Sequence, residues 1–179
     1  SVEAVKKQYP KVQMVKSEKN LGFSKGNNLG IKSISAESYL LLNSDTSVQS
    51  GSLDKLYQFT VGSEFGITSC QLNSPDGSFQ ANAGELPKFG SVLMWLSGLD
   101  DLFKQKSYHT NLKNLYQDQM EVGWVSGSVM LIKDSVFKKI GLLDEKIFMY
   151  GEDVEYCFRA NQSGIKVGWT NSASITHIG

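Results

Sequence analysis

The chain has 179 residues, 40% of them hydrophobic, and its 18 basic residues balance its 18 acidic ones. This composition predicts one globular domain over residues 1–179 with a sizeable core, and it argues against a general electrostatic grip on nucleic acid. No apolar run approaches the roughly 20 residues that a helix needs to span a bilayer, so we expect a cytoplasmic protein. The two cysteines, Cys70 and Cys157, show no metal-ligand spacing and are expected to be reduced core thiols.

Hydrophobic periodicity and turn residues predict the elements of the first half. In chain order these are a helix over 1–8, a strand over 12–15, a loop over 17–26, a helix over 27–34, a strand over 39–42, a helix over 51–60 and a strand over 65–70. The run Tyr39–Leu42 is continuously apolar, which is typical of a strand covered on both faces of a sheet.

The second half is less regular at first. We expect, in chain order, a hairpin tip at 75–77, two or three short helices within 84–121, a strand over 124–132, a helix over 134–140, a helix over 153–162 closed by Gly164, and a strand over 165–169. Strands that alternate with helices indicate an α/β sheet, parallel at least in its first half.

The polar turn Asn43-Ser44-Asp45-Thr46 ends the apolar strand. A carboxylate at the carboxyl end of such a strand lies where open α/β sheets bind ligands, and it suits Mg²⁺ or Mn²⁺ shared with a diphosphate. Asp and Ser also dominate turns and helix caps, and the turn taken alone favours that structural role.

Two acidic residues, Glu152 and Asp153, begin the predicted helix that follows Gly151. The helix dipole and its free amides favour ionised carboxylates there, and a carboxylate held rigidly at such a position is a plausible general base. The alternative is a structural role, in which these charges complement the dipole and Glu155 pairs with Arg159 on the surface.

Residues 20–30 form a segment rich in Gly and Asn that matches neither the dinucleotide fingerprint nor the Walker lysine pattern. Such a segment brings backbone N–H groups close to an anion or a nucleotide, although a flexible loop explains it as well. A lone histidine such as His177 is more often structural than a ligand, and His109 has no context that assigns it a role.

The order and spacing of these motifs carry a resemblance. The chain reads N-x-G-F-x-x-G-N-N-x-G-I from Asn20, L-L-N-x-D-T from Leu41, G-L-L-D-E-x-x-F-M-Y-G-E-D-x-E-x-x-x-R from Gly141, and H-x-G from His177. Over essentially the whole chain this resembles the inverting glycosyltransferases with the GT-A fold. The rhamnosyltransferase-like members, which build bacterial cell-surface polysaccharides, look closest.

The resemblance implies an α/β fold with a mixed, mostly parallel sheet flanked by helices. Residues 1–83 would bind the donor, and residues 84–179 would hold the acceptor-side and catalytic part. Relatives begin with a strand and an Asp-containing loop that cradle the nucleobase. This chain shows no such segment before Ser1, so we expect the chain alone to bind nucleotide sugar weakly or not at all.

Roles for single residues follow from the resemblance alone. Asp153 would be the general base, with Glu152 shaping the acceptor site. Asp45 would bind the metal and the diphosphate, with Asn43 in place of the family's first Asp, and His177 would be a further metal ligand. The nucleotide side would be lined by Gly22, Lys25, Asn27 and Asn28. The acceptor side would include Trp124, Gly127, Ser128 and Tyr150.

The implied partners are a divalent metal (Mg²⁺ or Mn²⁺), a UDP- or dTDP-sugar, and a glycan or lipid-linked acceptor, with no nucleic acid. Trp95 and Trp124 are candidates for stacking on a sugar, although a place in the core fits them equally well. The apolar face of residues 91–103 would suit the inner membrane surface, and a buried helix or a homo-oligomer contact explains it as well. The alternative functions are a nucleotidyltransferase and an inactive binding or scaffold module.

Overall fold

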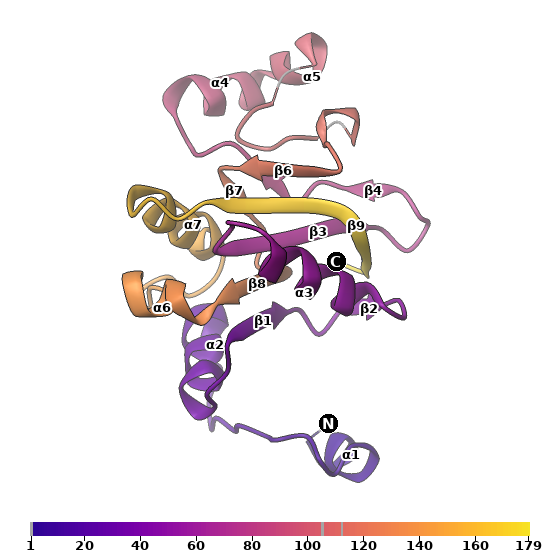
Figure 1. Cartoon of the computed structure of the whole chain (residues 1–179), viewed down its shortest axis with the longest axis vertical. Coiled ribbons are helices and arrows are strands. Elements are labelled where there is room, and N and C mark those ends of the chain that lie inside the picture. The colour runs from indigo at the N-terminus through magenta and orange to yellow at the C-terminus, as the bar shows by residue number, and fades with distance from the viewer. Residues whose placement is uncertain (1, 105, 112) are drawn as a thin grey trace.

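The structure, a computed structural model, describes residues 2–104, 106–111 and 113–179. The first predicted helix is confirmed as α1 (Val2–Gln8), while its predicted first residue, Ser1, lies outside the described residues. Gln105 and Leu112, which belong to the predicted acceptor-side region, lie outside them as well. Helix α1 buries none of its residues and lies apart from the sheet, at the bottom of Figure 1.

A mixed sheet forms the centre of the molecule (Figure 1). Its strand order is β1-β8-β3-β9-β2, with β4 paired to β3 and β6 paired to β9. The strands are β1 (Ser38–Leu42), β2 (Thr46–Val48), β3 (Ile67–Asn73), β4 (Phe79–Gln80), β6 (Gln119–Val122), β8 (Val129–Lys133) and β9 (Val167–His177). A second, two-stranded sheet pairs β5 (Ala83–Gly84) with β7 (Trp124–Val125).

The predicted α/β fold with a mixed sheet is confirmed. Strands β1 and β3 run in the same direction but do not pair with each other, because antiparallel β8 lies between them and pairs with both. Strands β3 and β9 pair in parallel, with a register shift between Cys70 and Gln71. The carboxyl ends of β1, β3 and β9 therefore lie at one edge of the sheet, where ligands bind in open α/β folds.

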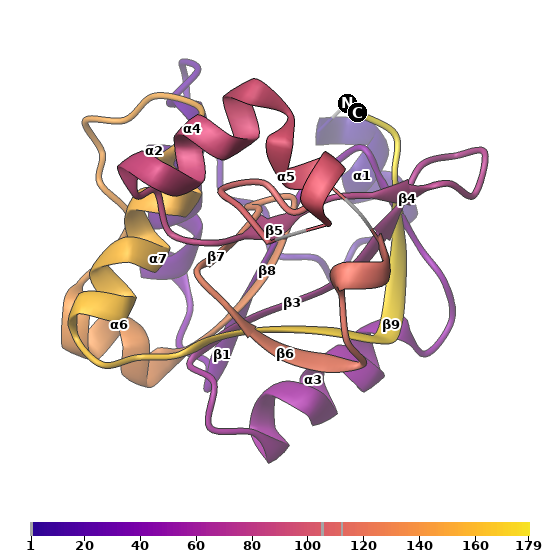
Figure 2. The ribbon, with the colours of Figure 1, turned by 90° about the horizontal axis from the view of Figure 1, so that it is seen from above.

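Helices cover both faces of the sheet (Figure 2). Helix α3 packs on one face, and α2, α6 and α7 pack on the other. The helices are α2 (Gly22–Ser33), α3 (Ser52–Gly62), α4 (Phe89–Ser97), α5 (Leu99–Phe103), α6 (Asp134–Ile140) and α7 (Glu152–Gln162), with a 3₁₀ turn at Lys113–Leu115. Helices α4 and α5 lie at the top of Figure 1, beyond the small β5–β7 sheet.

The two covered faces of the sheet explain why β8 is apolar from Val129 to Ile132. Along β8, Val129 and Leu131 belong to the buried cluster under α3, whereas Met130 and Ile132 belong to the cluster under α6 and α7. Side chains of a strand alternate between faces, so a strand covered on both sides needs apolar residues at every position.

Helix α2 begins earlier than the sequence predicted. It starts at Gly22, not at Asn27, because other groups satisfy the first amides of the helix: Asn20 Oδ1 accepts the Gly22 N–H at 2.9 Å, and the Phe148 carbonyl accepts the Phe23 N–H at 2.9 Å. The glycines at positions 22, 26 and 30 explain why the sequence did not predict the first turns of this helix, since glycine is a poor helix former.

Three strand predictions need correction. Residues 12–15 form no strand, and Val12 and Val15 are exposed. The single strand predicted over 124–132 is divided into β7 and β8 by a turn at Ser126–Ser128. In this turn the Gly127 N–H donates to the Asp153 carboxylate on α7 and not to a neighbouring strand. The last strand, predicted over 165–169, runs from Val167 to His177.

The outer face of α4 and α5 is apolar. Its exposed large side chains are Phe89, Leu93, Leu96, Leu99, Leu102 and Phe103. Within the described ranges, no helix combines the length and hydrophobicity that crossing a membrane requires.

Strand β1 ends the sheet, and in the described residues it pairs only with β8. A hollow of about 340 Å³ lies beside it, lined by α2, by β1 and by the segment that contains Gln13 and Val15. The outer edge of β1 is therefore open.

Candidate functional site

The carboxylate of Asp153 is held rigidly at the start of α7. The preceding Gly151 has φ 88°, a left-handed backbone conformation that starts the helix directly after the loop. One carboxylate oxygen accepts the Gly127 N–H at 3.0 Å, and the other accepts the Val154 N–H at 2.8 Å. The turn between β7 and β8 and the first turn of α7 thus fix this side chain together.

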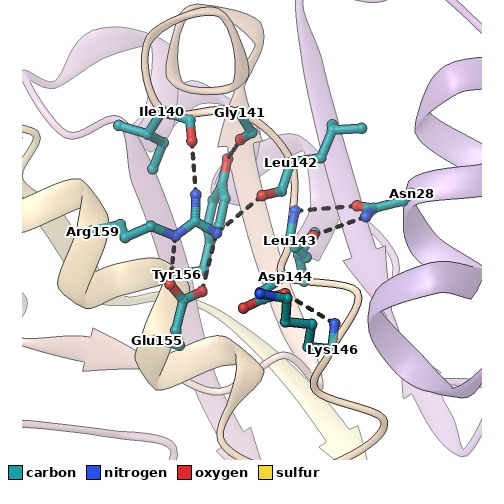
Figure 3. A network of polar contacts seen from close by, with 10 residues as sticks. All are labelled: Asn28, Ile140, Gly141, Leu142, Leu143, Asp144, Lys146, Glu155, Tyr156 and Arg159. Carbon is teal, nitrogen blue, oxygen red and sulfur yellow. Dashed lines mark hydrogen bonds and ion pairs between the residues drawn. The ribbon is translucent and has the colours of Figure 1, made fainter.

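The loop before α7 is held by a polar network (Figure 3). Arg159 donates to the carbonyls of Ile140 and Leu142 at 2.7 and 2.9 Å and pairs with Glu155 on its own helix. Tyr156 donates its hydroxyl to the Gly141 carbonyl at 3.0 Å. Because these contacts fix the loop to α7, they help to define the position of Asp153.

Asn28 belongs to this network, from the side of α2. Its Nδ2 donates to the Leu143 carbonyl at 2.9 Å, and its Oδ1 accepts the Leu143 N–H at 3.2 Å (Figure 3). Asn28 is 1% exposed, so its amide is fully occupied by the protein. It ties α2 to the loop and does not present its amide to a nucleotide.

Two cavities meet at Asp153. The first, of about 400 Å³, is lined by Asn20, Gly22, Phe23, Asn43, Ser126, Gly127, Ser128, Met149, Tyr150, Glu152 and Asp153. The second, of about 280 Å³, is lined by Ala81, Asn82, Tyr108, His109, Trp124, Ser126, Tyr150, Gly151, Glu152, Asp153 and Val154. Asp153 and Glu152 line both cavities, so a molecule bound in either one would lie beside these two carboxyl groups.

Glu152 is buried beside Asp153. Its side chain is 5% exposed, and within the described residues its Oε2 has no hydrogen-bond partner. Burial raises the pKa of Glu152, and the neighbouring Asp153 charge raises it further. An unpartnered buried carboxylate oxygen that lines two cavities is a ready hydrogen-bond group for a bound molecule.

Asp45 and His177 form a second polar pair at the same edge of the sheet. Strand β2 follows Asp45 and pairs Thr46 with His177, which brings His177 Nε2 to 3.4 Å from Asp45 Oδ1. The other ring nitrogen of His177 lies 3.0 Å from Gln80 Oε1. The Nε2 atom is buried and makes no hydrogen bond within the described part of the chain.

This pair fits a divalent cation. A carboxylate oxygen and an orphaned imidazole nitrogen face each other, and both are metal donor groups. No group of three or more His, Cys, Asp or Glu with metal-site geometry occurs in the described residues, so most of the coordination positions of such a cation would be open to a ligand or to water. The turn from Asn43 to Thr46 connects this pair to the first cavity, which Asn43 lines.

Aromatic rings form one wall of the second cavity, which Tyr108, His109 and Trp124 line. Their ring centroids lie 4.7–5.7 Å apart, and Trp95 contacts Tyr108 and His109 at 5.4 and 5.0 Å. Burial lowers the pKa of His109, and the Asp153 charge partly offsets this. The sequence assigned no role to His109, because its neighbours in this wall come from segments that show no common pattern.

The predicted site residues are only partly brought together. Glu152, Asp153, Gly22, Gly127, Ser128 and Tyr150 line the first cavity, and Trp124 lines the second. Lys25 is exposed and lines neither cavity. Asn27 donates to the Phe23 carbonyl at 3.0 Å and lines the hollow beside β1 instead. Asp45 lines neither cavity and is connected to the first one through Asn43.

Comparison with known proteins decides the family. The model of the family described as "Glycosyltransferase like family 2" matches residues 1–178. The chain belongs to this family. Over 93% of its length, this chain is 31% identical to the low-salt glycan biosynthesis hexosyltransferase Agl10 of Haloferax volcanii.

A second relative comes from Mycobacterium tuberculosis. It is an N-acetylglucosaminyl-diphospho-decaprenol L-rhamnosyltransferase. The two sequences are 26% identical over a region that covers 98% of this chain. The chain spans 52% of the length of the first relative and 61% of the second.

A solved structure confirms the fold of this family member. The crystal structure of GalNAc-T7 with UDP, GalNAc and Mn²⁺ superposes with a TM-score of 0.69. The superposed region includes 99% of this chain and 34% of the GalNAc-T7 chain, and the sequence identity within it is 15%.

Proposed function

We propose that this chain carries the catalytic site of an inverting glycosyltransferase, which moves a sugar from a nucleotide-diphosphate donor to an acceptor hydroxyl. One observation carries the proposal: Asp153, fixed by the Gly127 N–H, lines two cavities whose remaining linings come from different segments of the chain. A displacement reaction needs a base with a donor on one side and an acceptor on the other. The family supports sugar transfer as the reaction.

The first cavity would hold the donor sugar. It lies beside the turn from Asn43 to Thr46, and therefore beside the Asp45–His177 pair. Gly22 brings the start of α2 into this cavity without a side chain. Gly127 and Ser128, which the sequence placed on the acceptor side, would then face the donor.

The second cavity would hold the acceptor. Its aromatic wall suits the apolar face of a sugar ring, and the Glu152 carboxylate would accept a hydrogen bond from one of its hydroxyls. Asp153 would take the proton from the attacking hydroxyl as the new bond forms. Attack by one acceptor opposite the leaving group would invert the anomeric configuration.

Asp45 and His177 would hold the divalent metal, Mg²⁺ or Mn²⁺. A cation there would neutralise charge on the departing diphosphate. The donor would be a UDP- or dTDP-sugar; UDP and Mn²⁺ accompany the GalNAc-T7 neighbour.

A lipid-linked acceptor is part of the proposal, because the mycobacterial relative is named for a diphospho-decaprenol substrate. The exposed apolar residues of α4 and α5 would then contact the inner face of the membrane from the cytoplasm. The division into a donor part, 1–83, and an acceptor part, 84–179, stays a prediction.

The substitution Asp153→Asn in the full-length protein tests the reaction. Loss of one general base lowers turnover by about 10²–10⁴-fold, while donor affinity should stay nearly unchanged. Asp54→Asn, on the exposed side of α3, is the matched control and should keep full activity. Equal loss of turnover and donor affinity would remove Asp153 from the base role.

The products separate this proposal from its alternatives. Release of a nucleoside diphosphate with transfer to the acceptor supports it, whereas release of pyrophosphate would identify a nucleotidyltransferase. Donor binding without any release would identify an inactive binding module.

Paramagnetic Mn²⁺ tests the metal site independently of activity. The chain has two histidines, so each ring can be followed by NMR. Small amounts of Mn²⁺ should broaden the His177 signals before those of His109, and Asp45→Asn should weaken this effect. Broadening of His109 first, or no broadening of His177, would contradict the metal assignment.

A further inference from the structure

The imidazole of His109 lies in the aromatic wall of the second cavity. Its ring centroid lies 5.0 Å from that of Trp95, at 32°, and 4.7 Å from that of Trp124, at 76°. Tyr108 contacts it edge-on at 4.9 Å. The ring is thus held from three sides and lines the cavity together with Asp153.

The backbone around His109 is fixed to the small sheet. Trp124 Nε1 donates to the Tyr108 carbonyl at 2.7 Å, and the Ser107 hydroxyl donates to the His109 carbonyl at 2.7 Å. The Thr110 N–H donates to the Ala83 carbonyl on β5 at 3.2 Å. A side chain on a segment anchored in this way meets a ligand in a preset orientation, which lowers the entropic cost of binding.

The two ring nitrogens of His109 make no side-chain hydrogen bond in the part of the chain that the structure describes. Across residues 2–104, 106–111 and 113–179, no protein group hydrogen-bonds to either ring nitrogen of His109. Burial lowers the pKa of His109 and so favours the neutral ring, although the Asp153 charge partly offsets this. A neutral imidazole has one N–H donor and one acceptor nitrogen. A neutral imidazole held by aromatic rings, with unused polar atoms in a cavity, is suited to a ligand that combines apolar faces with hydroxyl groups.

We infer that His109 is a specificity-determining residue, which recognises a hydroxyl of the acceptor sugar beside the one that Asp153 deprotonates. This inference rests on the proposed function. The second cavity is the sugar subsite: the aromatic rings contact the C–H face of a pyranose, while His109 and the unpartnered oxygen of Glu152 receive neighbouring hydroxyls. His109 takes no proton from the attacking hydroxyl, so its loss should weaken acceptor binding more than turnover.

Two substitutions separate the ring from its hydrogen bonds. His109→Phe keeps an aromatic ring in the wall and removes the polar atoms, whereas His109→Gln keeps a donor and an acceptor. With p-nitrophenyl glycosides of glucose, galactose and N-acetylglucosamine as acceptors, His109→Phe should raise the acceptor KM about 3- to 10-fold, the effect of one lost hydrogen bond. The donor KM should change less than the acceptor KM. His109→Gln should restore part of the acceptor affinity.

NMR tests the subsite without turnover. On titration with the same glycosides, the ring signals of His109 should shift, while those of His177 serve as the internal control. Thermal unfolding checks that both variants fold. A wild-type acceptor KM in His109→Phe, or glycoside binding that shifts His177 and leaves His109 unchanged, would overturn the inference.

The two levels of the proposal fail differently. If the protein releases no nucleoside diphosphate but the glycosides still shift His109, glycosyl transfer is refuted and the sugar subsite stands. If transfer occurs and His109 does not respond, the subsite assignment is refuted and the proposed function stands.

Discussion

The substitution Glu152→Gln should stabilise the protein at neutral pH, although it changes a residue of the candidate site. Glu152 is 5% exposed, and one of its oxygens has no hydrogen-bond partner among the residues that the structure describes, so its ionised form is buried at a cost. An unsatisfied buried group costs about 1–3 kcal/mol, and more when it is charged. Glutamine removes the charge but leaves a neutral unpaired atom and loses about 0.3–1 kcal/mol of interaction with the helix dipole. A net gain of about 1 kcal/mol is expected, which for a chain of this length raises Tm by about 2–4 °C.

The pH dependence of this gain has a defined sign. Because burial raises the pKa of Glu152, the folded protein binds the proton more tightly than the unfolded chain does. The destabilising effect is full above the folded-state pKa and vanishes below the ordinary glutamate pKa of about 4.3, where both states are protonated. The Tm difference between Glu152→Gln and wild type should therefore be largest at pH 7–8 and disappear near pH 4.

The substitution Glu155→Gln, three residues further along α7, is the control for Glu152→Gln. Glu155 forms a two-point ion pair with Arg159, which also holds the loop before α7. Glu155→Gln should therefore lower Tm by about 2–4 °C, the effect of roughly 1 kcal/mol. Calorimetric or fluorescence melting of both variants between pH 4 and pH 8 gives the comparison. If Glu152→Gln is destabilising at pH 7.5, the side chain has a partner in solution and the reasoning fails.

Two further predictions concern packing and burial. Gly22 has φ +72°, and a Cβ there would lie 2.3 Å from the Phe148 carbonyl oxygen, so Gly22→Ala should cost about 2 kcal/mol or more in urea unfolding. Gly30→Ala, on the same helix with open space around it, should instead stabilise by about 0.5–1 kcal/mol, and equal effects would contradict the assigned contact. Burial raises the pKa of Cys70 and of Cys157 to about 12, so neither thiol should react with a disulfide reagent at pH 8 in the folded protein, and both should react in urea. Rapid labelling of the native protein would show that these segments open.

Local patterns were enough for elements that carry their own signal. The apolar run of Tyr39–Leu42 correctly predicted strand β1. The apolar stripe along one face of α7 and the acidic residues at its start correctly predicted that helix, because the helix dipole acts on residues in its first turn. Helix α2 was placed too late, since its start depends on a contact with Phe148, more than a hundred residues away. Strand β6 was missed although its sequence, Gln119–Val122, alternates between exposed and buried residues.

The site was predictable where a motif spanned it. Asp153 and Glu152 were identified from their place at a helix start, and they do line the cavities. Asn28 looked like a ligand-binding amide, but whether such a group faces a ligand or the protein depends on the loop that packs against it. The sequence did not predict a role for His109, because the rings that contact it, Trp95 and Trp124, come from separate parts of the chain.

The free side of β1 has a consequence for handling the protein. On the side of β1 that faces away from β8, the backbone of Ser38–Leu42 pairs with no other strand of the described residues and borders a hollow. An unpaired strand edge of this kind is a template for another extended segment. Two copies of the chain can satisfy these backbone groups by joining their sheets edge to edge. Concentration-dependent self-association is therefore expected, and light scattering at several dilutions should precede any attempt to attribute a weak affinity to the ligand site itself.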